Sequence, residues 1–331
     1  MQPEWMQQAA QQAAIDAPIQ VKALPPVIPG RVLHLDGDLL CYWAGGSEET
    51  TVGESRQRAI GKINALRDQS GSERVVMHLT ADASTKGDRR IIAQVKQYQG
   101  QRKASRKPKN WGYLREWAES YAGDLFTVKV WATREADDGI ALCCADWFRK
   151  SVWSPDDADT CLVAIASADK DMRMFGGLHV DWNTFALEYV PHGAFDHMGA
   201  NGKQFGHRWF WEQMLQGDTA DNIPGLPKWY GKLCGAATAA KLLSGIKDND
   251  TASAMVYAGY EAEYGEEADD RFIEQAMLLW MRDDMQADIG NVQQVLPRSF
   301  EAAINRVRAR IKEKYEEAQG LGSCAVPSDR A

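Results

Sequence analysis

The sequence has few residues that could hold a soft metal or cross-link an extracellular domain. It contains six cysteines and six histidines in 331 residues, with no CxxC pair and no zinc-like spacing of cysteine with histidine. We therefore expect reduced, mostly buried thiols. No apolar run approaches the length of a membrane span, and the N-terminus lacks the basic-then-apolar pattern of a signal peptide. These absences predict a cytoplasmic protein with no membrane partner.

Charge is distributed unevenly along the chain. The formal net charge of −8 by itself disfavours a nucleic-acid partner. Segment 86–109, however, has a net charge of +8 and leaves −16 for the rest. This pattern predicts a local track for a polyanion and a separate set of cation-binding carboxylates, although a solvated basic helix would give the same segment. The basic residues are Lys86, Arg89, Arg90, Lys96, Arg102, Lys103, Arg106, Lys107 and Lys109.

Hydrophobic patterning divides the chain into a core and two tails. Residues 1–29, rich in Gln, Ala and Pro, and residues 321–331 are interpreted as flexible tails. Within 30–203, short apolar runs alternate with helical stripes, which indicates an α/β domain with a parallel sheet. Residues 204–320 show mainly helical patterns. The predicted strands are Arg31–Leu35, Val75–Leu79, Leu125–Val130 and Leu162–Ala166.

Acidic residues follow each predicted strand closely. Because ligands of open parallel sheets bind beyond the carboxyl ends of the strands, these acids are expected to converge. A single acid after a strand is also a common helix cap, so the pattern matters more than any one residue. The acids are Asp36, Asp82, the group Glu135, Asp137 and Asp138, and the pair Asp169 and Asp171.

Convergence of carboxylates has an electrostatic cost. Two carboxylates at ~4 Å repel by about 4 kcal/mol at an effective dielectric near 20, so a packed group requires protons or cations. Ligand sets made of oxygen alone favour Mg²⁺ or Mn²⁺. Such ions suit phosphodiester hydrolysis, because one can activate water while a second stabilises the leaving oxygen.

One string gives a more specific signal. Residues 216–225 read QGDTADNIPG, which resembles the GDxxDNIPG signature of the 5′ nuclease superfamily. Other motifs of that superfamily have counterparts in the same order, and the similarity spans about residues 31–243. These counterparts are LDGD at 35–38, YQGQRK at 98–103, EADD at 135–138 and ADKD at 168–171.

The resemblance implies a fold and an activity. The fold would be a PIN-like 5′ nuclease core at 30–203, with a helical arch at about 84–112. A helical DNA-binding region at 204–320 would contain a helix–hairpin–helix at about 209–245. The activity would be that of a 5′→3′ DNA exonuclease with flap endonuclease activity, similar to stand-alone bacteriophage enzymes. We expect a monomer that acts on DNA with a free 5′ end or on branched, flap DNA.

The resemblance also implies a ligand set for two Mg²⁺ or Mn²⁺ ions. Asp38 has no counterpart as a ligand and is interpreted as a turn or capping residue. The first ion would be held by Asp36, Asp82, Glu135 and Asp137, and the second by Asp138, Asp169, Asp171, Asp218 and Asp221.

DNA contacts are implied at the arch and at the hairpin. The arch would pass a free 5′ single strand, on which Tyr98 and Trp111 could stack. In the hairpin, backbone N–H groups would grip phosphates, with a K⁺ ion nearby; a plain surface loop is the alternative. The implied contacts are Lys86, Arg89, Arg90, Arg106, Lys107 and Lys109 in the arch, and Gly225, Lys228, Gly231, Lys232 and Gly235 in the hairpin.

The sequence departs from the superfamily at Gln99, where relatives have a lysine that assists at the scissile phosphate. We expect Arg102, one helical turn away, to supply the lost charge. Lys96, Lys103 and Tyr98 complete the predicted catalytic set. Three alternatives stay open: a catalytically weakened DNA-binding protein of the same fold, an RNase-H-like activity on RNA–DNA hybrids, and a PIN-type ribonuclease. The GDxxDNIPG string and the hairpin disfavour the last.

Overall fold

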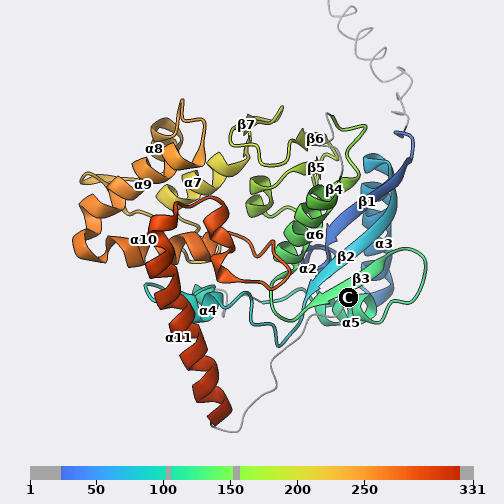
Figure 1. Ribbon diagram of the computed structural model, residues 1–331. Coiled ribbons are helices and arrows are strands. Elements are labelled where there is room, and N and C mark those ends of the chain that lie inside the picture. Colours follow the sequence, from blue (N-terminus) through green and yellow to red (C-terminus); the bar gives the residue numbers. More distant parts are fainter. Residues whose placement is uncertain (1–23, 102–105, 152–156, 321–331) are drawn as a thin grey trace, which may run out of the picture.

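The computed structural model describes residues 24–101, 106–151 and 157–320 (Figure 1). Most of both predicted tails lies outside these residues, and so do the predicted catalytic residues Arg102 and Lys103. The first strand begins at Ile28, inside the stretch predicted as a tail. Within the described ranges, no helix has the length and apolar character needed to cross a bilayer.

A six-stranded sheet forms the centre of the fold, with the order β3-β2-β1-β4-β5-β6. Neighbouring strands from β3 to β5 are parallel, and β6 pairs antiparallel with β5 at one edge. The predicted α/β class with a parallel sheet is therefore confirmed. The prediction missed β5 and β6, which have only four residues each. The strands are β1 (Ile28–Asp36), β2 (Ser72–Thr80), β3 (Thr127–Trp131), β4 (Val163–Ala166), β5 (Gly177–Val180) and β6 (Leu187–Val190).

The crossovers place helices on both faces of the sheet. From β1 to β3 the chain moves toward one edge, and it then returns past β1 to β4. Because parallel crossovers are right-handed, the helices of these two stretches cover opposite faces, as Figure 1 shows for α3 and α6. The strand order thus reverses between β1 and β4, where open sheets bind ligands. The helices are α2 (Gly37–Ala44), α3 (Val52–Ser70), α5 (Trp111–Glu119) and α6 (Ala136–Lys150).

The C-terminal part is helical, as predicted for 204–320. Its helices are α7 (His207–Gln216), α8 (Ala236–Leu242), α9 (Asn249–Tyr264), α10 (Ala268–Leu279) and α11 (Glu301–Gly320), with 3-10 turns η3 (Gly265–Glu267), η4 (Ile289–Gln294) and η5 (Arg298–Phe300). Two small hairpins precede and follow α7: β7 (His197–Met198) with β8 (Gln204–Phe205), and β9 (Lys228–Trp229) with β10 (Lys232–Leu233). A helix, a hairpin and a helix thus follow one another from α7 to α8.

The segment predicted as a helical arch has little helix in its described residues. Within 84–112, the only α-helical residues among them are those of α4 (Arg89–Ile92) and the start of α5. Both α10 and α11 contact α4. This part of the basic segment therefore packs against the C-terminal helices.

Close packing at Gly139 gives a test of the fold. Gly139 lies in α6, and a Cβ there would overlap the indole of Trp131. The indole stacks on His78, with ring centroids 5.9 Å apart, so it has little room to move. We expect Gly139→Ala to lower the free energy of unfolding by about 1–3 kcal/mol, measured by urea denaturation.

The matched control is Gly61→Ala in α3, where a Cβ would meet nothing within 4 Å. This exposed helical position should gain about 0.5–1 kcal/mol of stability from alanine. Equal effects at the two glycines would contradict the packing of α6 on β3.

Candidate metal centre

A cavity opens at the carboxyl ends of β1 and β4, next to the reversal of strand order. Its volume is about 330 Å³. No cysteine or histidine of the described residues lines it. The structure thus brings acids from several strand ends into one place, with oxygen atoms as the available ligands. The polar lining residues are Asp36, Asp38, Thr80, Gln99, Glu135, Asp137, Asp169 and Asp221.

Helix starts fix the orientation of two of these acids. The Asp36 carboxylate caps α2, accepting hydrogen bonds from Leu39 N and Ser167 Oγ, both at 2.9 Å. Asp169 caps the 3-10 helix η2 (Lys170–Met174) by accepting from Asp171 N at 2.8 Å. The helix-cap interpretation is thus correct for both residues. It is compatible with metal binding, because a capped carboxylate is already oriented before any ion arrives.

Several acids have a raised pKa because burial and neighbouring acids outweigh any nearby positive charge. Burial and the neighbouring carboxylate of Asp38 raise the pKa of Asp36 to about 6. Burial and nearby carboxylates raise the pKa of Asp171 to about 8, and they raise the pKa of Asp137 well above its usual value. A raised carboxyl pKa means that the ionised form is destabilised, and a bound divalent ion would remove that cost.

Asp138, by contrast, is already balanced by a cation. Its Oδ1 accepts from Arg89 and from Arg282 N at 2.7 and 2.9 Å, and its Oδ2 accepts from Arg89 and from Glu135 N at 2.7 and 3.0 Å. Although burial acts in the opposite direction, Arg89 lowers the pKa of Asp138 to about 2. Each carboxylate oxygen of Asp138 already accepts two hydrogen bonds, which does not support its predicted role as a metal ligand.

The same ion pair corrects the predicted role of Arg89. Its side chain is buried, with 3% of the residue exposed. Its guanidinium also donates to the Leu278 carbonyl at 3.1 Å. Arg89 therefore cannot belong to an exposed track for DNA, contrary to prediction.

A second group of acids adjoins the cavity. Carboxylate oxygens of Asp171, Asp218 and Asp221 lie within 4.8 Å of one another. The Lys170 ammonium lies 3.2 Å from Asp171 and 2.6 Å from Asp218. Gln213 donates to Asp171 at 2.5 Å. Of this group only Asp221 also lines the cavity, so it connects the two sets of carboxylates.

Two glycines shape the loop that carries Asp218 and Asp221. Gly217 and Gly225 have left-handed backbones, with φ of 76° and 62°. They lie against each other, and a Cβ on Gly225 would overlap the Gly217 backbone. The motif therefore needs glycine at both ends. The Gly225 amide already donates to Gln275 Oε1 at 3.0 Å, so it is not free to bind phosphate as predicted.

Tyr98 connects the two groups of acids. Its hydroxyl lies 2.6 Å from a Glu135 oxygen and 3.0 Å from an Asp221 oxygen. The residue is only 5% exposed. Tyr98 is therefore too buried to stack on a DNA base, contrary to prediction, and its hydroxyl holds an acid of each group.

The positions of Asp82 and Asp38 differ from the roles predicted for them. Asp82 is exposed in the loop after β2 and is not among the described residues that line the cavity, so its position does not fit the predicted metal ligand. Asp38 does line the cavity. Its carboxylate accepts from Thr80 N at 3.2 Å and pairs with Arg115. Both aspartates of the LDGD string, Asp36 and Asp38, line the cavity, although only Asp36 was predicted to be a metal ligand.

The other predicted DNA contacts lie mainly on the surface. Lys107 lies with its ammonium 3.3 Å from the centroid of the Trp111 ring, and Arg106 pairs with Glu48. Lys86 differs from these residues, because it contacts Glu135 at the cavity. The exposed residues are Arg90, Lys96, Arg106, Lys107, Lys109, Lys228, Gly231, Lys232 and Gly235.

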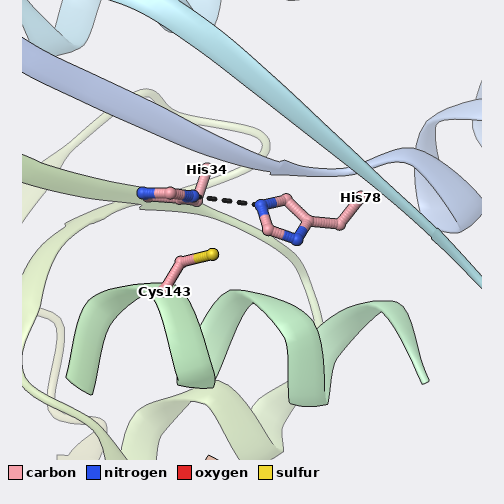
Figure 2. A group of neighbouring side chains, drawn as sticks. All are labelled: His34, His78 and Cys143. Carbon is pink, nitrogen blue, oxygen red and sulfur yellow. Dashed lines mark hydrogen bonds between the residues drawn. The ribbon is translucent and has the colours of Figure 1, made fainter. Parts of the chain in front are cut away.

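A separate group of nitrogen and sulfur atoms lies between the sheet and α6 (Figure 2). Figure 2 shows His34 of β1, His78 of β2 and Cys143 of α6 facing one another. Their potential ligand atoms lie within 4.8 Å of one another. Since side chains two apart on a strand share a face, His34 lies on the same face as Asp36.

Hydrogen bonding argues against a metal ion at this second group. The Trp131 indole N–H donates to His78 Nδ1 at 3.1 Å, so the His78 proton is on Nε2. That proton faces His34 Nδ1 at 3.0 Å (Figure 2). Both nitrogens of His78 are thus used. Burial lowers the pKa of His34 to about 4, which keeps the pair neutral. We interpret the group as a buried polar network.

Solved structures from bacteriophage T5 are similar to this chain. The D15 protein co-crystallised with metal ions has 14% identity and a TM-score of 0.48, over 85% of this chain and 99% of that chain. The same values hold for a T5 D15 flap endonuclease variant in a pseudo-enzyme–product complex with DNA and metal ions. A T5 5′-exonuclease variant has 12% identity and a TM-score of 0.45, over 85% and 98%. No protein-family model and no curated protein matches the chain.

Charge balance predicts opposite stability effects for two neighbouring acids. In EDTA, Asp138→Asn should lower the free energy of unfolding by about 3–5 kcal/mol, because it removes the bidentate partner of buried Arg89, which keeps only its 3.5 Å contact with Glu135. Asp137→Asn should raise it, because it removes an uncompensated carboxylate. Urea denaturation measures both, with Asp146→Asn on the same helix as the control. Destabilisation of similar size in both variants would refute the distinction between them.

Proposed function

We propose that the chain is a divalent-metal-dependent nuclease that hydrolyses phosphodiester bonds of DNA at or near a free 5′ end. It would act as a 5′→3′ exonuclease with flap endonuclease activity. The observation that carries the proposal is the cavity lined by carboxylates, among which Asp36 and Asp137 have raised pKa values and no ion-pair partner among the described residues that offsets them. The motifs between residues 35 and 225 resemble those of 5′ nucleases in the same order, and this resemblance supports the direction of cleavage.

Carboxylate oxygens without thiolate or imidazole fit Mg²⁺ or Mn²⁺. When bound, such ions supply an activated water and stabilise the leaving oxygen. Tyr98 orients Glu135, and Ser167 orients Asp36, before any ion binds. We assign one ion to Asp36, Glu135 and Asp137, and a second ion to Asp169, Asp171, Asp218 and Asp221.

DNA would be held by phosphate contacts away from the cavity. Lys228 and Lys232 are exposed on the β9–β10 hairpin, and Gly231 and Gly235 are exposed in the same stretch. Such contacts grip the backbone without reading sequence. The polyanion track would consist of this hairpin and the exposed cations Arg90, Lys96, Arg106, Lys107 and Lys109. A K⁺ ion at the hairpin remains a prediction from the resemblance.

A DNA-binding protein with weakened catalysis is the second candidate. Gln99 favours it, because glutamine can donate a hydrogen bond to a phosphate but supplies no charge. The two candidates differ in turnover and not in binding. An RNA–DNA hybrid with a 5′ flap belongs among the substrates, since nothing in the described cavity selects the sugar.

Digestion with Mg²⁺ of four 5′-labelled DNAs tests the proposal: flap, nicked duplex, blunt duplex and single strand. Cleavage should begin at 5′ ends, and binding should weaken steeply with salt because phosphate contacts release counterions. Asp169→Asn should lower the cleavage rate about a thousandfold while DNA binding stays within a few fold. Asp146→Asn serves as the control.

Efficient degradation from a 3′ end, with the 5′ end blocked, would contradict the proposed direction. A near-normal rate for Asp169→Asn would contradict the ligand assignment. Tight binding of flap DNA without Mg²⁺-dependent cleavage would favour the second candidate.

A further inference from the structure

Most described cations around the cavity are already paired with acids of the protein. In the described part of the chain, Lys86 and Arg89 pair with the cavity acid Glu135, and Arg115 pairs with Asp38. Arg89 and Lys170 also pair with acids beside the cavity, Asp138 and Asp218. Arg89 and Arg115 are buried against acids and backbone carbonyls. Lys170 lies between two acids of the second group. The two buried guanidinium groups cannot reach a phosphate, and the Lys170 ammonium, although its side chain is 31% exposed, is held by two carboxylates.

Lys86 has a different environment. Its ammonium lies 2.9 Å from Glu135 Oε1 and donates to Gln99 Oε1 at 2.8 Å. Its side chain is 21% exposed, so it can be reached from the solvent. The Gln99 amide in turn lies 3.2 Å from Glu135 and 3.1 Å from Asp221. Lys86 is therefore held at the rim of the cavity by one acid and one neutral amide.

Backbone conformation supports a functional role for this contact. Lys86 and Gln99 both have left-handed backbones, with φ of 55° and 53°. Such conformations cost of order 1–3 kcal/mol each in residues other than glycine, and they are concentrated at functional sites. Lys86 and Gln99 are two of the seven described residues other than glycine that have positive φ, and their side chains meet.

We propose that Lys86 places a positive charge beside the scissile phosphate, and that Gln99 is the positioning residue that holds it there. The inference rests on the proposed function, and its ligand is a non-bridging oxygen of a phosphodiester. When Glu135 serves as a metal ligand, its charge is taken up, and the Lys86 ammonium stays tethered to Gln99 and is available to the phosphate. A lysine at position 99 would instead set two ammonium groups side by side.

This proposal gives Lys86 the role that the sequence predicted for Arg102, and that earlier prediction stays untested. Arg102 lies outside the described residues, and Lys96 is exposed on the surface. Lys86 already contacts the cavity acid Glu135. It precedes Gln99 by 13 residues, so no helical or strand spacing could have connected them.

Single-turnover cleavage of 5′-flap DNA with Mg²⁺ tests the inference. Lys86→Met should lower the rate about a hundredfold, with DNA affinity within a few fold, and Lys86→Arg should keep most of the rate. Adding Gln99→Lys to Lys86→Met should restore about tenfold or more, because the charge returns from the neighbouring position. Lys150→Met, at the exposed far end of α6, controls for the loss of one charge.

Calorimetric titration with Mn²⁺ separates a catalytic role from a structural one. Lys86→Met should bind Mn²⁺ at least as tightly as wild type, because it loses a competing cation at Glu135. Weaker Mn²⁺ binding, a wild-type cleavage rate in Lys86→Met, or no restoration by Gln99→Lys would overturn the inference and leave the nuclease function intact. A wild-type protein that cleaves no substrate would instead refute the function, and the inference with it.

Discussion

The buried ion pair between Arg89 and Asp138 is the interaction on which the arrangement of the site depends. Asp138 belongs to the first turn of α6, on the sheet, and Arg89 begins α4 in the basic segment. The C-terminal part closes over the pair, because Arg89 donates to a carbonyl of α10 and Arg282 N donates to Asp138. Three parts of the chain thus meet at one point, which brings Tyr98 and Gln99 over the acids.

Around this pair the acids divide into two electrostatic classes. Although burial acts in the opposite direction, Lys86 and Arg89 lower the pKa of Glu135, and Asp138 is likewise balanced within the protein. Asp36 and Asp137 are not balanced, and burial raises the pKa of both. The unbalanced acids lie where the strand order reverses. The fold therefore provides an oriented set of oxygen ligands whose repulsion a divalent ion can relieve.

Residue patterns predicted the parallel sheet and most of the acids, because apolar runs and the acids that follow them are local signals. They failed where the outcome depends on which way a side chain faces. Asp82 follows β2 closely but lies exposed, whereas Asp38 is turned into the cavity at the start of α2. Charge and aromaticity suggested that Arg89 and Tyr98 face DNA, yet contacts with α10 and the acids bury both. The pairing of Lys86 with Gln99 is a tertiary contact that no spacing rule encodes.

Anomalous X-ray diffraction from crystals soaked in Mn²⁺ tests the metal centre most directly. It locates the ions without relying on activity or on a choice of DNA substrate. The proposed centre predicts two anomalous peaks, one in the cavity beside Glu135 and Asp137 and one beside Asp169 and Asp171. No peak at these acids, or a peak only between His34 and His78, would contradict it.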